Sequence, residues 1–216
     1  MANQQLLWYV AYGPGLDRAR VFAALSCGGL AHSGANQGQT HRSKWLGVDQ
    51  SLVIPGGLKF TVTTPDTGHV SAIYVPGADG EVLARAYLLT VSQFSSLVAR
   101  LNGKTVSHDL ELSSIQHRGY GDVLTGPYGQ VRYLGKLDKY LSYTVTPSAW
   151  KNARPSPPSS AYIRLLGNGL LRSHELPPLG IGAYIVQWPG ADGEFTPADV
   201  ASIVAPNIKF FTATPS

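Results

Sequence analysis

Trp8-Tyr9-Val10-Ala11-Tyr12-Gly13-Pro14-Gly15-Leu16 is the most informative segment of this 216-residue chain. Its first five residues are apolar, aromatic or β-branched, which predicts a strand that is covered on both faces. The Gly-Pro-Gly sequence then predicts a tight turn, and Asp17 can cap a helix that ends before Gly28. A strand, a glycine turn and a helix in this order can present backbone N–H groups to a carboxylate or an oxyanion.

The composition is that of a folded protein rich in turns and aromatic side chains. Apolar residues make up 44% of the chain, which has 11 Tyr, 24 Gly and 15 Pro but only 14% charged residues. Such a chain favours sheets joined by turns over a helical bundle. The net charge of +4 comes from scattered Lys and Arg, without the basic cluster that binding to nucleic acid or a membrane surface requires. We therefore expect neither of these partners.

The cysteine and histidine content argues against metal sites and disulfides. Cys27 is the single cysteine, which excludes an internal disulfide, and we interpret it as structural. The six histidines are dispersed and none has metal-ligand spacing, so we expect neither a metal nor a cofactor. There is no apolar run near the ~20 residues of a membrane span, and the N-terminus lacks a signal-peptide pattern. We expect a cytoplasmic monomer or homodimer that acts on a small molecule.

The rest of the chain alternates strand and helix patterns. Residues 26–47 are turn-rich and predict a long surface loop. Alternating apolar residues predict strands at 52–54, 58–63, 69–75, 81–90, 109–115, 131–137 and 140–146. Helical spacing predicts helices at 91–101, 160–172, 178–186 and 197–204, the last capped by Thr196. The sum is an α+β fold with a mixed sheet or barrel of six to eight strands.

A stretch rich in proline and serine divides this pattern in two. We expect residues 1–146 to form a β-barrel domain and residues 147–160 to be a tether. Residues 161–216 would then be C-terminal helices that pack on the same domain. The function of the tether and of the last fifteen residues stays open.

Two motifs, far apart in the chain, resemble one family. Tyr12, Gly13 and Leu16 match the Tyr-Gly-Ser-Asn-Leu loop of the gamma-glutamylcyclotransferase-like superfamily, with Pro14 and Gly15 in place of Ser and Asn. Pro158-Ser159-Ser160-Ala161-Tyr162, followed by Gly169 and Leu176-Pro177, is similar to its C-terminal Pro-Ser-x-x-Tyr helix. The chain thus resembles a divergent member, akin to the butirosin-type cyclotransferases. The resemblance implies the family's small mixed barrel, here with a helical C-terminal extension.

The resemblance also implies a reaction that this sequence is poorly equipped to perform. Enzymes of the superfamily release 5-oxoproline from gamma-glutamyl compounds or cleave related amides, with one glutamate that moves the proton. That glutamate lies near the end of the helix after the central strand. Here the aligned position is Leu101, or Asn102 if the gap moves by one, and residues 82–108 contain no Glu or Asp. Because a positioned base contributes ~10²–10⁴-fold to a rate, the standard reaction is doubtful.

Other carboxylates are candidates for the missing group. Glu81 opens the strand that leads into the helix, with Arg85 four residues on as its partner on the same face. Glu111 alternates with Leu110 and Leu112, so in a strand it faces solvent unless the lumen of a barrel is polar. We take Glu111 and Glu81 as the candidate catalytic residues, each with a simpler interpretation as a surface charge.

The candidate substrate-binding residues come from the two motifs and the aligned helix: Tyr12, Gly13, Pro14, Gly15, Leu16, Leu101 and Tyr162. Three functions remain open. The first is an enzyme that cyclises or rearranges a small amide or amino-acid-derived intermediate, natural-product precursors included, without the usual glutamate. The second is a non-catalytic pseudoenzyme that binds a metabolite or a partner on the same fold. The third is a true cyclotransferase whose glutamate comes from elsewhere, such as Glu111.

Overall fold

The computed structural model describes residues 5–26, 47–64, 67–105 and 108–206. Cys27 and most of the loop predicted at 26–47 lie outside the described residues, as do the last ten residues. The strands are β1 (Leu6–Ala11), β2 (Asp49–Pro55), β3 (Gly57–Thr64), β4 (His69–Val75), β5 (Glu81–Thr90), β6 (Tyr120–Asp122), β7 (Gln130–Leu137) and β8 (Tyr140–Thr146). The helices are η1 (Gly13–Leu16), α1 (Arg18–Ser26), α2 (Val91–Leu101), α3 (Ser113–Arg118), η3 (Trp150–Asn152), α4 (Ser160–His174), α5 (Pro178–Val186) and α6 (Pro197–Val204).

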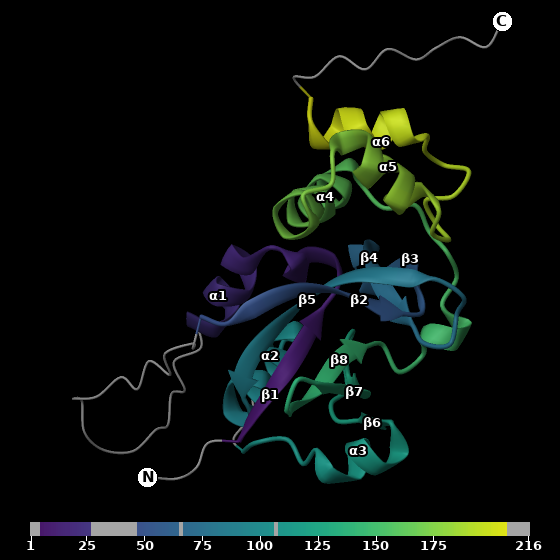
Figure 1. Cartoon of the computed structure of the whole chain (residues 1–216). Helices are drawn as coiled ribbons and strands as arrows, with labels where there is room; N and C mark the ends of the chain where they lie inside the picture. The colour runs from purple at the N-terminus through teal and green to yellow at the C-terminus, as the bar shows by residue number, and fades with distance from the viewer. Residues whose placement is uncertain (1–4, 27–46, 65–66, 106–107, 207–216) are drawn as a thin grey trace, which may run out of the picture.

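Six strands form a mixed sheet in the order β2-β5-β1-β8-β7-β6 (Figure 1). Strand β1 lies inside this sheet, where it pairs antiparallel with β5 and parallel with β8. Its residues 7–11 are all buried, which agrees with the strand expected from the sequence. Strands β3 and β4 form a separate two-stranded sheet. The predicted α+β class with a mixed sheet and a helical C-terminal part is confirmed.

The two faces of β1 contribute to two different cores, because successive side chains of a strand point to opposite sides. Trp8 and Val10 pack with residues of β3, β4 and helices α4–α6. Leu7 and Tyr9 pack instead with α2 and with Ile115 of α3. Figure 1 shows the C-terminal helices gathered at one end of the molecule, with α3 at the other. None of the helices in the described segments combines the length and hydrophobicity that crossing a bilayer requires.

The strand predicted at 109–115 is wrong. Residues 113–118 form helix α3 instead, which ends at Gly119 with a positive φ of 80°. The alternation of Leu110, Glu111 and Leu112 covers only three residues, too few to separate a strand from a helix. The Glu111 carboxylate accepts hydrogen bonds from the backbone N–H (3.0 Å) and the hydroxyl (2.6 Å) of Ser113. The local polar contacts therefore favour a helix start at this point.

Residues 147–160 contact the second sheet along much of their length. The Lys59 ammonium of β3 donates to the carbonyl of Ala153 at 3.0 Å, and the Thr61 hydroxyl donates to that of Arg154 at 2.7 Å. The backbone N–H of Ser156 donates to the carbonyl of Phe60 at 2.9 Å. The segment between β8 and α4 is thus attached to β3, so that α4 is brought back over the sheet.

A glycine in α5 permits the close packing of the last two helices. A Cβ built on Gly182 would lie 2.2 Å from the carbonyl oxygen of Pro197, where α6 begins. We therefore expect Gly182→Ala to lower the free energy of unfolding by about 1–3 kcal/mol, because the backbone of α6 must shift. The substitution does so although alanine is the better helix former by about 1 kcal/mol.

Gly180→Ala is the matched control in the same helix. Its nearest neighbours would be ring carbons of Pro177 at 3.3 and 3.4 Å, so the strain is small. We expect this variant to be neutral or slightly stabilised in urea unfolding, measured side by side with Gly182→Ala. Equal midpoints for the two variants would contradict the packing argument.

Candidate functional site

The glycine turn after β1 is a short 3₁₀ helix, η1. Side chains of strand β5 donate hydrogen bonds to two of its carbonyl groups. Gly13 starts it with a φ of 74°, a conformation that favours glycine. The Tyr87 hydroxyl donates to the carbonyl of Gly15 at 2.7 Å, and the Arg85 guanidinium donates to that of Leu16 at 3.4 Å. Asp17 accepts from the N–H of Ala19 at 3.0 Å, as expected for the cap of α1. The turn has a fixed shape because β5 binds it.

The opposite side of the turn is covered by Tyr162 of α4. The Tyr162 hydroxyl accepts a hydrogen bond from the N–H of Ala72 at 2.8 Å, and it would lie 3.3 Å from a Cβ on Gly13. Leu16 packs closely against Gly169: a Cβ built on Gly169 would lie 2.8 Å from the Cβ of Leu16. The two sequence motifs are therefore in direct contact. The Gly13 side of the turn is packed by the chain's own side chains.

Four hydroxyl groups meet beside this turn, and we call them the hydroxyl cluster: Thr63 of β3, Ser71 of β4, Tyr128 and Tyr162. Burial raises the pKa of the Tyr128 hydroxyl, and hydrogen bonding to Ser71 and Thr63 offsets part of that rise. Burial also raises the pKa of Tyr162, with Ser71 again opposing the shift. The Thr63 hydroxyl donates to Ser71 at 3.3 Å. Both tyrosines are thus protonated at neutral pH, and each has an O–H available to donate.

The cluster reaches the surface at the end of the two-stranded sheet. Thr63 is half-buried and His69 is exposed, whereas Ser71 and Tyr162 are buried. The His69 ring lies 6.1 Å from that of Tyr162, centroid to centroid, with its plane at 76°. Tyr12 lies deeper and donates to the carbonyl of Val145 at 2.5 Å. A ligand would therefore meet the cluster from the side of Thr63 and His69.

Asn102 holds Tyr128 in place from the end of α2. Its side-chain oxygen accepts from the N–H of Tyr128 at 2.8 Å, and its amide group donates to the carbonyl of Tyr128 at 3.0 Å and to that of Val98 at 2.8 Å. A Cβ on Gly126 would lie 2.4 Å from the Asn102 oxygen, so only glycine permits this approach. At the helix end where the resemblance places a glutamate, this chain has a buried amide that anchors a tyrosine.

The remaining predicted site residues do not join this cluster in any contact that the structure records. Leu101 is 36% exposed at the end of α2. Glu111 is exposed and bound to Ser113, which lowers the pKa of its carboxyl group. Glu81 is exposed at the start of β5, beside Pro55 of β2. Their assignment as substrate-binding and catalytic residues stays a prediction.

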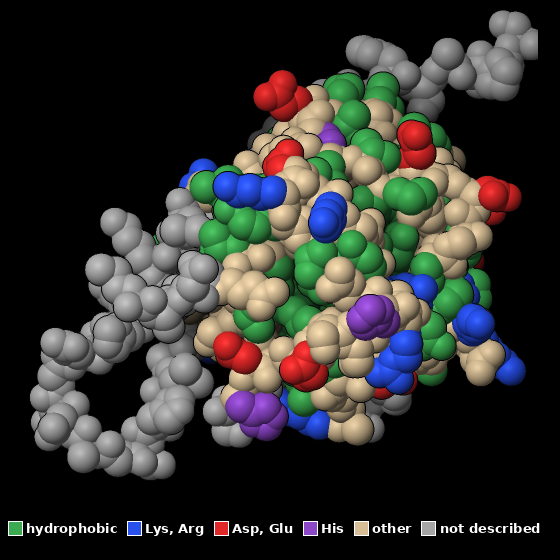
Figure 2. Space-filling view, turned by 60° about the horizontal axis from the view of Figure 1, so that its bottom comes forward, with side chains coloured by type: hydrophobic (Ala, Val, Ile, Leu, Met, Phe, Trp, Pro, Cys, Tyr) green, Lys and Arg blue, Asp and Glu red, His purple; other side chains and the backbone are tan. Residues whose placement is uncertain are grey.

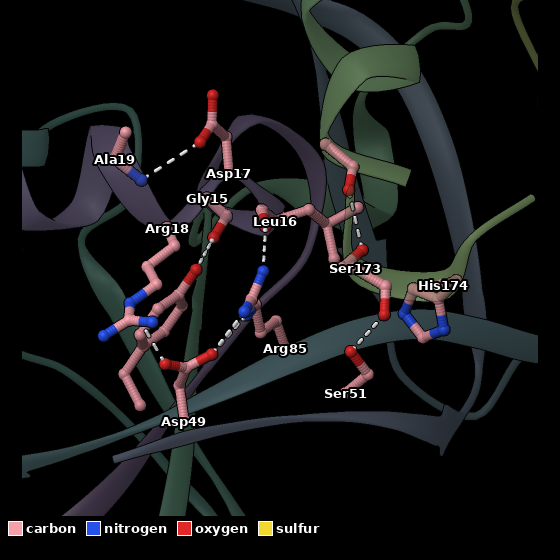
Figure 3. A network of polar contacts seen from close by, with 12 residues as sticks. Gly15, Leu16, Asp17, Arg18, Ala19, Asp49, Ser51, Arg85, Ser173 and His174 are labelled. Carbon is pink, nitrogen blue, oxygen red and sulfur yellow. Dashed lines mark hydrogen bonds and ion pairs between the residues drawn. The ribbon is translucent and has the colours of Figure 1, made fainter. Parts of the chain in front are cut away.

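The expected pairing of Arg85 with Glu81 is wrong, because Arg85 binds Asp49 instead (Figure 3). The Arg85 guanidinium contacts the Asp49 carboxylate at 2.5 and 2.6 Å, and Arg18 contacts it at 3.3 Å. The Asp49 side chain is 6% exposed. Asp49 lies on β2, which pairs with β5 in a register that places Ser51 opposite Arg85. The Asp49 carboxylate therefore serves an ion pair with the arginine that binds the turn.

Charged side chains do not gather in one patch on the face that Figure 2 presents. Positive and negative side chains are scattered over this face, among apolar and uncharged ones.

The sequence predicted Tyr12 and Tyr162 as site residues but not Ser71, Thr63 and Tyr128. Tyr128 lies in the glycine-rich stretch between α3 and β7, and its double hydrogen bond to Asn102 has no local signature.

Comparison with known proteins supports the fold. No family model matches the chain, and no curated protein sequence gives a significant match. A solved structure described as a gamma-glutamyl cyclotransferase matches 94% of this chain and 100% of its own, with 14% identity and a TM-score of 0.51. An uncharacterized protein from Homo sapiens matches 93% of this chain and 98% of its own, with 13% identity and a TM-score of 0.49. The match to the first of these structures shows that the chain has the gamma-glutamyl cyclotransferase fold.

Proposed function

We propose that this chain binds a small amide or amino-acid-derived molecule, natural-product intermediates included, at the hydroxyl cluster, and that it does not release 5-oxoproline. The observation that supports this most strongly is the helix end at Leu101 and Asn102. There an exposed leucine and a buried amide stand in place of a carboxylate, and the amide holds Tyr128. Burial and Tyr128 raise the pKa of the Tyr162 hydroxyl. The groups that oppose this rise are the backbone of Ala72, the Ser71 hydroxyl and Arg20.

The chemistry of the cluster suits recognition of an oxygen acceptor. A protonated tyrosine has one O–H to donate. Because the pKa of Tyr128 is raised, its hydroxyl stays protonated near neutral pH, so no phenolate is present to act as a base. Such donors match the carbonyl of an amide or a carboxylate oxygen. Without a base, deprotonation of an attacking amine loses the ~10²–10⁴-fold that general base catalysis contributes. Binding without the family reaction follows from these two points.

A second candidate is an enzyme that cyclises its ligand by positioning. The observation in its favour is the position of Tyr128, whose backbone N–H and carbonyl are both bound by Asn102. A donor held in place stabilises charge that develops on a carbonyl oxygen, and orientation alone accelerates intramolecular reactions. This activity would need a substrate that loses its proton without assistance from a carboxylate.

The test incubates the full chain with gamma-glutamyl amides and measures 5-oxoproline by mass spectrometry. We expect none above the uncatalysed background. In parallel, NMR would follow the backbone amides of Gly13 and Ala72 while L-glutamine, a small amide, is added. We expect saturable shifts at both, reduced at least tenfold in affinity by Tyr128→Phe.

The matched control is Tyr140→Phe, because Tyr140 lies at the start of β8, where no contact with the cluster is recorded. This variant should bind like the unmodified chain. Robust formation of 5-oxoproline would overturn the proposal, since it requires a proton acceptor. Absence of saturable shifts with L-glutamine and its gamma-linked derivatives would overturn the binding claim as well.

A further inference from the structure

Strand β7 carries an arginine whose charge no described carboxylate compensates. Arg132 is half-buried, and its Nη1 donates to Oε1 of Gln130 at 3.0 Å. Within the described ranges, the ion pairs involve Asp49 and Asp17 and none includes Arg132. A guanidinium has five N–H donors, and this one is recorded with a single acceptor. Burial accordingly lowers the pKa of Arg132.

An aromatic ring lies beside this guanidinium. Its central carbon lies 5.2 Å from the centroid of the Tyr120 ring, which is 49% exposed on β6. Tyr120 and Arg132 face each other across the β6–β7 pair, so that their side chains share one side of the sheet. Thr144 is the next partner across the sheet, and its hydroxyl bonds to the carbonyl of Val10 in β1. Arg132 therefore lies on the face of the sheet to which Trp8 and Val10 belong.

An open depression of about 500 Å³ lies beside Tyr120 and is lined by Arg118, Tyr120, Gly121 and Asp122. Arg118 is exposed, and its recorded bonds are to the backbone and hydroxyl of Ser114. Asp122 is the carboxylate among the lining residues. Its Oδ1 accepts from the Gln130 amide at 3.0 Å and from the Ser148 hydroxyl at 2.7 Å. Arg118 thus lines the depression together with one carboxylate that already has two donors, and the Tyr120 ring joins the depression to Arg132.

We infer that Arg118, Tyr120 and Arg132 form a binding site for a small oxyanion, a carboxylate or a phosphate group. The planar guanidinium of Arg132 matches the two oxygens of such a group, and the ring of Tyr120 restricts its orientation. Arg118 adds a second positive charge at the rim of the depression. The site uses residues different from those of the hydroxyl cluster, and it stands whether or not that cluster binds a ligand.

The test titrates the full chain with inorganic phosphate and, separately, with succinate, at constant ionic strength. NMR follows the backbone amide of Gly121 and the side-chain Nε–H of Arg132. We expect saturable shifts with at least one of the two anions, and the better probe tells a phosphate site from a carboxylate site. Arg132→Gln should weaken binding at least tenfold. Lys136→Gln, an exposed position on the same strand, should leave it unchanged.

Arg132→Lys is the second variant in case the glutamine variant does not fold. It keeps the charge but loses the planar fork, so we expect affinity between that of the other two proteins. Shifts that stay linear with both anions would overturn the inference. The same holds if Arg132→Gln, shown to be folded by its amide spectrum, binds either anion as tightly as the unmodified chain.

Discussion

Tyr162→Ala is expected to lower the free energy of unfolding by about 3–5 kcal/mol, as large-to-small changes of buried aromatic residues do. The Tyr162 side chain is 3% exposed and its ring contacts Phe60 edge to face at 6.2 Å. Its hydroxyl is the recorded acceptor for the N–H of Ala72 and covers Gly13. Truncation would remove the contact between α4 and the turn and leave that N–H without its acceptor. Chemical unfolding in urea measures the loss.

One variant separates the ring of Tyr162 from its hydroxyl, and a second controls for exposure. Tyr162→Phe keeps the ring and should cost about 1–3 kcal/mol, the range for a buried donor that loses its partner. Tyr120→Ala changes a tyrosine that is 49% exposed, and it should cost less than about 1 kcal/mol. A loss below about 0.5 kcal/mol in Tyr162→Ala is the range of surface substitutions and would contradict the burial of this side chain.

Asp49→Ala should lower the free energy of unfolding by about 3–5 kcal/mol, the range for a buried ion pair that loses one partner. Arg85 is 15% exposed in its side chain and binds both Asp49 and the carbonyl of Leu16. Without the carboxylate, its charge would remain largely buried beside the turn. Arg18, at 52% exposure, can turn to solvent and contributes little to this loss. Thermal and urea unfolding should agree on the size of the effect.

The control for this network is the ion pair between Arg172 and Asp17, which has the same chemistry in a more exposed place. The Arg172 side chain is 61% exposed, so Arg172→Ala should cost less than about 1 kcal/mol. The double variant Asp49→Ala with Arg85→Leu should be more stable than Asp49→Ala alone, because it removes the unpaired charge. A double variant that is less stable than the single one would show that Arg85 contributes mainly through packing.

Local signals in the sequence were sufficient for most elements. The helix at 91–101 follows from its apolar spacing, and Thr90 with Gln93 forms the reciprocal cap at its start. Residues 178–186 and 197–204 form the helices expected, the last capped by Thr196 as predicted. The error at 109–115 arose where three alternating residues had to decide between a strand and a helix. Side-chain hydrogen bonding by Ser113 and Glu111 decided it.

The site was harder to predict because its contacts join distant segments. Tyr12 and Tyr162 were identifiable from motifs, since each motif is short and continuous. Tyr128 depends on Asn102, which is 26 residues away, and on a glycine that permits the approach. Arg85 binds Asp49 and not Glu81 because the pairing of β2 with β5 sets this contact. Residue spacing along β5 alone does not indicate it. Contacts of this kind follow from the register of the sheet, which the sequence pattern did not specify.

The position of β1 inside the sheet has a consequence for how the chain acquires its structure. Leu7 pairs with Leu141 of β8 on one side and with Leu89 of β5 on the other. During synthesis, β1 must therefore wait for its neighbour β8, which is translated far later. Closing such long loops is entropically costly and slows folding. A nascent chain released before β8 would leave one edge of its most apolar strand open to association with other chains.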